Sequence, residues 1–142
     1  MDADVRRLMA AVASALGRDL KIEDFNDRLV IQKGCYILNS WGFGPMYRFN
    51  MYVRGPYSTT LADEYYKIGD VTFRDTTVPD EAVDALRSIF SKGLGYSEAY
   101  TMVLMLKNKN PNASYNRIKE RALELKPHLS SEIEEASLSL LI

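Results

Sequence analysis

Residues 46–58 read MYRFNMYVRGPYS and contain the clearest strand pattern in the chain. From residue 46 to residue 53 the side chains alternate between two faces, as the pleat of a β-strand requires. One face would carry Tyr47, Phe49, Met51 and Val53, and the other Met46, Arg48, Asn50 and Tyr52. The alternation predicts a strand over residues 46–53 with one apolar and one mixed face. Gly55 and Pro56 then predict a sharp turn.

Two helices are predicted before this strand. Apolar residues recur at steps of three and four over residues 2–16 and again over residues 25–40, which is the period of an amphipathic helix. The second helix is apolar around much of its circumference, a pattern typical of a central, buried helix. Either Asp24 or Asn26 would cap its N-terminus.

A third helix is predicted directly after the turn. It would begin after Ser58 or Thr60, where a capping-box pattern is present, and end at Gly69. Residues 71–74 then predict a short second strand, which we expect to pair with the first. In the remaining chain, three helices are predicted over residues 79–92, 98–108 and 114–126, the middle one capped by Ser97, and a last helix opens at Ser131.

These elements predict a mainly α (α+β) fold in a single domain, residues 1–142. The order helix, helix, strand, helix, strand is compatible with a winged-helix-like core over residues 1–78. That core would contain a small two- or three-stranded antiparallel sheet. A helical extension over residues 79–142 would form the C-terminal half.

The composition is that of an ordinary globular chain and excludes several kinds of site. The 142 residues are 46% apolar and 26% charged, with a formal net charge of −1, so disorder is not expected. Cys35 and His128 are the single residues of their types, which excludes an intrachain disulfide and the usual zinc sites. No signal peptide or apolar run of membrane-spanning length is found. We therefore expect a cytoplasmic protein that has no metal, no cofactor and no membrane partner.

The charges are distributed unevenly along the chain. Residues 28–62 contain four basic residues and no Asp or Glu, together with seven of the fifteen aromatic residues. Such a segment suits a phosphate-bearing partner, because cations neutralise phosphates and rings stack on bases. The alternative is a buried helix and strand with little room for carboxylates. The candidates for binding nucleic acid or another anion are Arg28, Lys33, Arg48, Arg54 and Ser58.

Two features of this segment predict binding surfaces. Arg48, Tyr52 and Arg54 fall on the mixed face of the predicted strand, so they would form one exposed patch. Arg54 also precedes the helix start near Ser58, where free backbone N–H groups favour anions. Exposed aromatic residues are frequent anchors for partner proteins, and the candidates of this kind are Trp41, Phe43, Tyr52 and Tyr57.

Residues 28–36, RLVIQKGCY, resemble the basic-Leu-x-x-Gln-Lys-x-x-Tyr helix of the Panacea, or SocA-like, antitoxin domains. They are similar also to small uncharacterised prokaryotic proteins in which this helix accompanies an aromatic strand and a Gly-Pro-Tyr-Ser turn, here residues 55–58. Lys126-Pro127, before the last predicted helix, looks similar as well. The resemblance implies a winged-helix-like or mostly helical fold and a regulatory or toxin-neutralising role, and it transfers no catalytic residue.

Three functional hypotheses follow. The first is a small prokaryotic regulatory or antitoxin-like binding protein, non-catalytic, whose basic and aromatic patch binds nucleic acid. The second is a protein–protein interaction module without nucleic-acid binding, whose partner is another protein, such as a toxin, or a second copy of the chain. The third is a hydrolase that uses Ser58 and His128, but a nucleophile motif such as Gly-x-Ser-x-Gly is missing.

Overall fold

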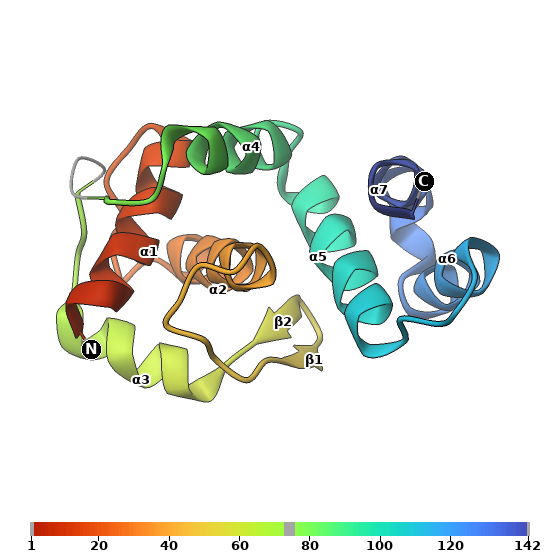
Figure 1. The fold of residues 1–142 in the computed structure, drawn as a ribbon, viewed down its shortest axis with the longest axis horizontal. Coiled ribbons are helices and arrows are strands. Elements are labelled where there is room, and N and C mark those ends of the chain that lie inside the picture. The colour runs from red at the N-terminus through yellow and green to blue at the C-terminus, as the bar shows by residue number, and fades with distance from the viewer. Residues whose placement is uncertain (1, 73–75, 142) are drawn as a thin grey trace.

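The computed structural model describes residues 2–72 and 76–141 and shows a mainly helical chain with one β-hairpin (Figure 1). The elements in chain order are α1 (Asp2–Leu16), α2 (Phe25–Ser40), β1 (Asn50–Tyr52), β2 (Gly55–Tyr57), α3 (Thr59–Ile68), α4 (Asp80–Phe90), α5 (Leu94–Lys109), α6 (Tyr115–Leu125), the short 3-10 helix η1 (Pro127–Leu129) and α7 (Ser130–Leu141). The predicted mainly α (α+β) class with a small antiparallel sheet is confirmed.

Helices α1 and α2 form the centre of the core, and both occupy their predicted ranges. α1 buries Leu8 and Val12 completely, and Asp24 caps α2 by accepting a hydrogen bond from the Asp27 N–H at 3.1 Å. The two helices approach closely at Gly34, where a Cβ would lie 2.4 Å from Val12 Cγ2. Glycine is unfavourable inside a helix, but here the contact between α1 and α2 requires it.

The hairpin corrects the predicted turn. Tyr52 lies opposite Gly55 in the antiparallel register, so the turn consists of Val53 and Arg54, and the predicted Gly55-Pro56 turn is wrong. Pro56 lies inside β2 instead. A proline is accepted there because its missing N–H is not needed for pairing with β1 at that position.

The predicted strand over residues 46–53 is paired only at its end, in β1. The segment before β1 is held by Asn39 of α2. The Asn39 side chain donates to the Pro45 carbonyl at 3.0 Å and accepts from the Tyr47 N–H at 2.9 Å. These bonds replace strand pairing at the beginning of the predicted strand.

The second predicted strand, residues 71–74, does not pair with β1. Val71 forms an isolated antiparallel bridge with Leu20, with N–H to carbonyl distances of 3.0 and 3.2 Å. Residues 73–74 lie outside the described residues. The expected pairing was wrong because the backbone of Val71 pairs with Leu20, in the segment between α1 and α2.

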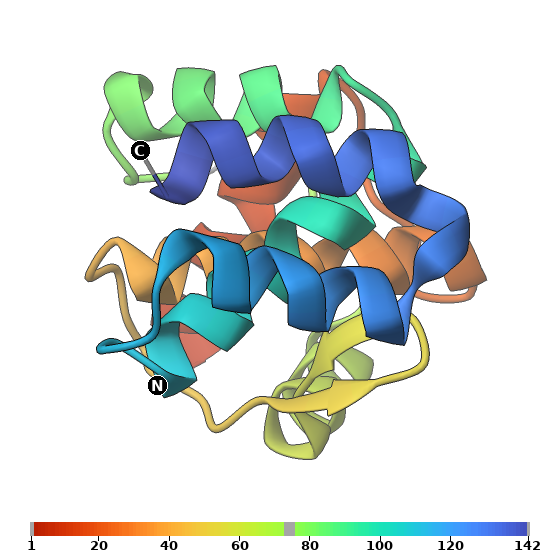
Figure 2. The same ribbon diagram turned by 90° about the vertical axis from the view of Figure 1, so that its right-hand side faces the viewer.

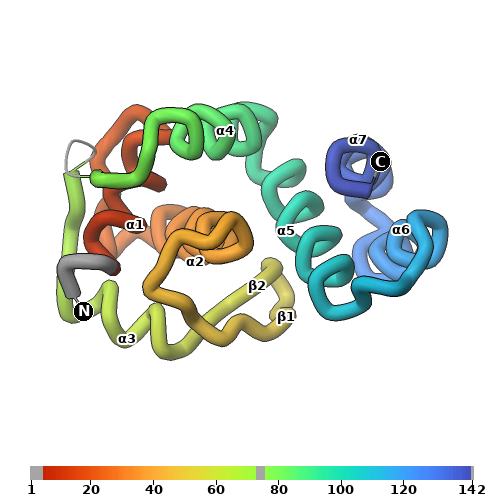
Figure 3. Tube along the Cα trace, in the orientation of Figure 1, coloured from red at the N-terminus to blue at the C-terminus, as the bar shows by residue number. Residues whose placement is uncertain are grey.

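α5 lies between the α1–α2 core and the α6–α7 pair, as Figures 1 and 3 show. It contacts α2 and β2 on one side and α6 and α7 on the other, and Figure 2 shows α6 and α7 side by side in front of it. The predicted Ser97 cap is wrong. α5 already begins at Leu94, after Gly93 with φ 102°, and Ser97 lies buried inside the helix, donating to the Leu94 carbonyl at 2.9 Å.

The order of elements differs from the one on which the winged-helix expectation depends. Both strands precede α3, whereas the expected order placed a helix between them. Helices from both sides of residue 78 pack together, α1 with α4 and α2 with α5. The winged-helix-like core over residues 1–78 stays a prediction. Within residues 2–72 and 76–141, no helix combines the length and the apolar character needed to cross a membrane.

Candidate functional site

Gln32 joins the middle of α2 to the end of the hairpin. Its Nε2 donates to the Ser58 carbonyl at 3.0 Å, and its Oε1 accepts from the Ser58 N–H at 2.8 Å. The Ser58 hydroxyl in turn accepts from the Leu61 N–H at 3.2 Å and caps α3. Ser58 is buried. Its side chain is therefore committed to the helix cap, and both of its backbone groups are satisfied by one glutamine.

Lys33, the next residue, reaches the turn of the hairpin. Its side chain is almost completely buried, and Nζ donates to the Arg54 carbonyl. Burial lowers the pKa of Lys33 to about 8; the nearby Glu98 carboxylate opposes this shift, and Lys126 and Arg54 add to it. The structure therefore places this predicted anion-binding lysine inside the molecule, where it supports the backbone.

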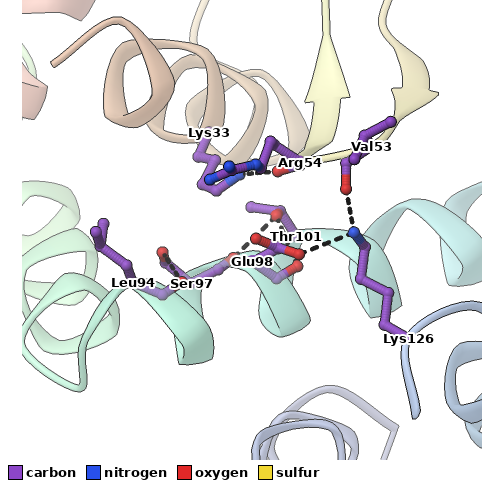
Figure 4. A network of polar contacts seen from close by, with 8 residues as sticks. All are labelled: Lys33, Val53, Arg54, Leu94, Ser97, Glu98, Thr101 and Lys126. Carbon is purple, nitrogen blue, oxygen red and sulfur yellow. Dashed lines mark hydrogen bonds and ion pairs between the residues drawn. The ribbon is translucent and has the colours of Figure 1, made fainter. Parts of the chain in front are cut away.

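Lys126, between α6 and η1, supports the same turn from the other half of the chain (Figure 4). Its Nζ donates to the Val53 carbonyl and forms an ion pair with Glu98 Oε2 at 2.8 Å. Both carbonyl groups of the two-residue turn thus accept a hydrogen bond from a lysine. We call Lys33 and Lys126, with the turn they hold, the lysine clamp.

Gly55 is required by the lysine clamp. Its φ of 114° lies in a region that residues with a side chain rarely adopt, and a Cβ there would lie 3.0 Å from Lys33 Nζ and 3.4 Å from Thr101 Oγ1. The Thr101 hydroxyl donates within α5, at 2.9 Å from the Ser97 carbonyl. The glycine of the Gly-Pro-Tyr-Ser motif therefore serves close packing between the hairpin and α5.

Tyr36 continues the internal role of the Gln-Lys-x-x-Tyr residues. Its hydroxyl accepts from Asn108 Nδ2 of α5 at 3.0 Å. Its ring packs edge-on against Phe49, with 5.1 Å between the centroids. The residues of this helix that carry the family resemblance therefore join α2 to the hairpin and to α5.

Outside the turn, two guanidinium groups and two rings form what we call the arginine–aromatic cluster (Phe25, Arg28, Arg54 and Tyr66). The Phe25 ring has Arg28 Cζ at 5.7 Å and Arg54 Cζ at 5.8 Å from its centroid, and Arg28 Cζ lies 5.8 Å from the Tyr66 centroid. Both rings are exposed. Arg28 also donates to the Ile22 carbonyl at 2.7 Å, so its position is fixed.

The remaining hairpin candidates lie on the exposed side of the strands. Tyr52 and Tyr57 stack, with centroids 5.3 Å apart and an interplanar angle of 23°. Arg48 is exposed before β1, while Arg54 belongs to the turn. The predicted strand face is therefore interrupted, and the structure brings Arg54 together with Arg28.

Trp41 and Phe43 lie at the other end of α2 from Phe25. Trp41 is the C-cap residue of α2, and it lines a hollow of about 350 Å³ with Tyr96 and Tyr100 of α5. Phe43 is half-buried against the core. These two partner candidates therefore belong to a surface separate from the hairpin turn.

Sequence reasoning missed four members of the site, Phe25, Tyr66, Glu98 and Lys126. Phe25 reads as a core residue from the apolar pattern of its helix, but it is exposed. Glu98 and Lys126 carry no local signal, because both reach the turn only when the C-terminal half packs against it. The Lys126-Pro127 resemblance is the one sequence feature that singled out Lys126.

Groups suited to catalysis are sparse. Burial raises the pKa of the Cys35 thiol to about 12, which keeps it protonated and unreactive at neutral pH. His128 lies in η1, and the Ser58 hydroxyl is used in the cap of α3. Across the described ranges, no group of three or more His, Cys, Asp and Glu side chains is placed to hold a metal ion.

Comparison of the chain with protein-family models, with curated proteins and with solved structures finds no match. The functional assignment therefore depends on the residues and geometry of the lysine clamp and the arginine–aromatic cluster.

Proposed function

We propose that this chain is a small, non-catalytic regulatory protein of the antitoxin-like kind, which binds a protein partner through the surface around its hairpin turn. The observation that carries the proposal is the lysine clamp. Lys33 and Lys126 come from opposite halves of the chain and hold both turn carbonyls. A turn held in this way presents the side chains of Val53 and Arg54 in one orientation, which lowers the entropic cost of binding.

The side chains around the turn have the chemistry of a protein interface. Val53 at the turn is 81% exposed. Phe25, Tyr52 and Tyr66 are exposed as well, and Arg54 lies beside Phe25. Arginine and aromatic residues are enriched at the energetic centres of protein interfaces. The exposed guanidinium group of Arg54 favours a partner that supplies carboxylates.

A nucleic-acid partner has less support from the same geometry. Lys33 and Ser58 are buried, and Arg28 is bound to a backbone carbonyl and to two rings. Arg48 and Arg54 are then the exposed cations left among the predicted candidates. Two separate arginines give a weak electrostatic footprint, because nucleic-acid affinity grows with the number of phosphates neutralised.

The antitoxin-like part of the proposal is supported by the resemblance described above. The residues that carry it meet in space: Gln32 binds Ser58, and Lys33 binds the turn next to Gly55. The motif residues therefore hold the hairpin and the surface around its turn in place. We infer that the resemblance includes these contacts, and with them the surface that the hairpin offers to a partner.

The test compares two surface variants with a control. Arg54→Glu and Val53→Asp change exposed side chains of the turn, whereas Arg117→Glu reverses an exposed arginine on α6. Each full-length protein is co-expressed with the product of the neighbouring gene, and affinity is measured by calorimetry together with rescue of growth. We expect the two turn variants to bind about tenfold more weakly or worse, with unchanged thermal unfolding, and Arg117→Glu to bind as the wild type does.

Nucleic acid is tested in parallel on immobilised single-stranded and duplex DNA over a range of salt concentrations. If the wild type is retained and Arg54→Glu is not, with a smaller salt slope, a nucleic-acid role replaces the protein-binding one. Equal partner affinity for the wild type and both turn variants would contradict the proposed surface.

A further inference from the structure

The outer edge of β1 has no partner strand in the described part of the chain. β1 pairs with β2 on one side, and β2 makes the hairpin's main contacts with α2 and α5. Figure 1 shows β2 nearer than β1 to α2 and α5. A single open strand edge offers a row of backbone donors and acceptors to another chain.

The register shows which backbone groups face outward. Met51 lies opposite Pro56, and a proline has no N–H to exchange. The pair is therefore of the non-hydrogen-bonded type, in which both backbone groups of each residue point away from the partner strand. The N–H and carbonyl of Met51 accordingly face the open edge.

The segment before β1 extends this edge. The strand-like alternation of the sequence continues back to residue 46, and Arg48 is exposed while Phe49 is buried, as in a strand. Nevertheless, within the described ranges the N–H groups of Arg48 and Phe49 have no hydrogen-bond acceptor. The strand pattern is therefore longer than the strand that is paired within this chain, and backbone groups between the Asn39 contacts and β1 are open to another chain.

We propose that an extended, acidic segment of a protein partner adds to the outer edge of β1 as a third strand, over residues 48–52. The proposal rests on the proposed function, since it assumes a protein partner. Backbone hydrogen bonds to Met51 supply affinity that does not depend on side chains, as in other cases of strand addition. Arg48 at one end of the edge and Arg54 beyond the other end select carboxylates on the added strand.

Charge disfavours a second copy of the chain at this edge. An antiparallel pair of β1 strands centred on Met51 would bring Arg48 of each copy towards the Arg54 turn of the other. Like charges that face each other across strands are destabilising. Residues 28–62 contain no carboxylate that could neutralise them. Charge therefore favours an added strand from a different and more acidic chain.

The probe is a short synthetic peptide in which valine and threonine alternate, with a glutamate near each end. The full-length protein is titrated with this peptide, and amide hydrogen exchange is followed by NMR. In the free protein we expect the Met51 amide to exchange faster than that of Tyr52, whose backbone groups pair with Gly55. Addition of the peptide should slow exchange at Met51 at least about tenfold, because a new hydrogen bond protects it.

Met51→Pro and Met51→Ala form the matched pair of variants. Both lose the same side chain, but only the proline loses the outward N–H, and a proline at an outward-facing edge position leaves the hairpin ladder intact. We expect Met51→Pro to bind the peptide about tenfold more weakly than Met51→Ala. A peptide that is N-methylated on the groups facing β1 should lose affinity for the wild type to a similar extent.

Several results would overturn the inference. The inference fails if Met51→Pro and Met51→Ala bind the peptide with equal affinity, or if the wild type does not bind it. It fails as well if a peptide with lysine in place of glutamate binds the wild type equally tightly. Concentration-dependent protection of Met51 in the free protein would assign the edge to a second copy instead. If Met51→Pro binds the natural partner normally while Arg54→Glu does not, strand addition fails and the proposed function stands.

Discussion

Replacing Lys33 with methionine separates the cost of burying its charge from the value of its hydrogen bond. Burial lowers the pKa of Lys33 from 10.5 to about 8, with Glu98 opposing the shift and Lys126 and Arg54 adding to it. Because the pKa in the folded state is lower than in the unfolded state, the unfolded chain binds more protons between these two values. The contribution of Lys33 to the free energy of unfolding therefore rises as the pH increases from about 8 to 10.5.

The size of the effect follows from the same two pKa values. At pH 7 the buried ammonium costs about 3 kcal/mol, and most of this cost is recovered by pH 10. Methionine removes this cost, but it leaves the Arg54 carbonyl without the Lys33 donor, which costs about 1–3 kcal/mol. Lys33→Met should therefore be as stable as the wild type or up to about 2 kcal/mol more stable at pH 7, and less stable than the wild type by up to about 2 kcal/mol at pH 10.

The assay is urea unfolding followed by far-ultraviolet circular dichroism between pH 7 and pH 10. The quantity of interest is the difference in unfolding free energy between the wild type and Lys33→Met. Burial raises the pKa values of tyrosines such as Tyr36 and Tyr100. Their ionisation affects both proteins equally, so its contribution cancels in this difference. Lys67→Met, at an exposed lysine on α3, is the control and should show no such dependence. If the curves of the wild type and Lys33→Met remain parallel over this pH range, the reasoning about Lys33 is refuted.

Three further predictions concern the core and the hairpin support. Gly34→Ala should destabilise the protein by about 1–3 kcal/mol, because its Cβ would overlap Val12. In thermal unfolding, adding Val12→Ala should restore much of this loss. Additive losses from the two substitutions would contradict the contact. Gln32→Leu leaves the Ser58 N–H and carbonyl unpaired and should lower the free energy of urea unfolding by about 2–4 kcal/mol. An unchanged free energy would show that water or another group replaces the amide. Cys35, whose pKa burial raises to about 12, should react with thiol reagents at pH 8 only after unfolding, and rapid labelling of the native protein would count against its burial.

Helix positions were predicted well because their signals are local. Asp24 caps α2 and Ser58 caps α3, and in each case the side chain bonds to a backbone group three residues away. The exception is Ser97, which resembles a cap but lies inside α5. Gly93, with its positive φ, ends the preceding segment and allows α5 to begin at Leu94.

Strand pairing was predicted poorly because a strand needs a partner that its own pattern does not specify. The alternation of residues 46–53 is correct for β1, but β2 was interpreted as a turn. Gly55 and Pro56 are poor strand residues in general. They are suited to this strand because Gly55 adopts a positive φ beside Lys33 and Pro56 faces a position where no N–H is required.

By itself, the sequence determined the mainly helical class, the ranges of most helices and the concentration of basic and aromatic residues between residues 28 and 62. Only the tertiary structure decided which of these residues form a surface. Lys33 is buried in the lysine clamp, whereas Phe25 is exposed beside Arg54. Periodicity and capping act over one helical turn, but burial depends on elements far apart in the chain, as the contact of Lys126 with the Val53 carbonyl shows. The net charge of −1 therefore describes the whole chain, while the binding surface that we propose depends on Arg48 and Arg54, which packing leaves exposed.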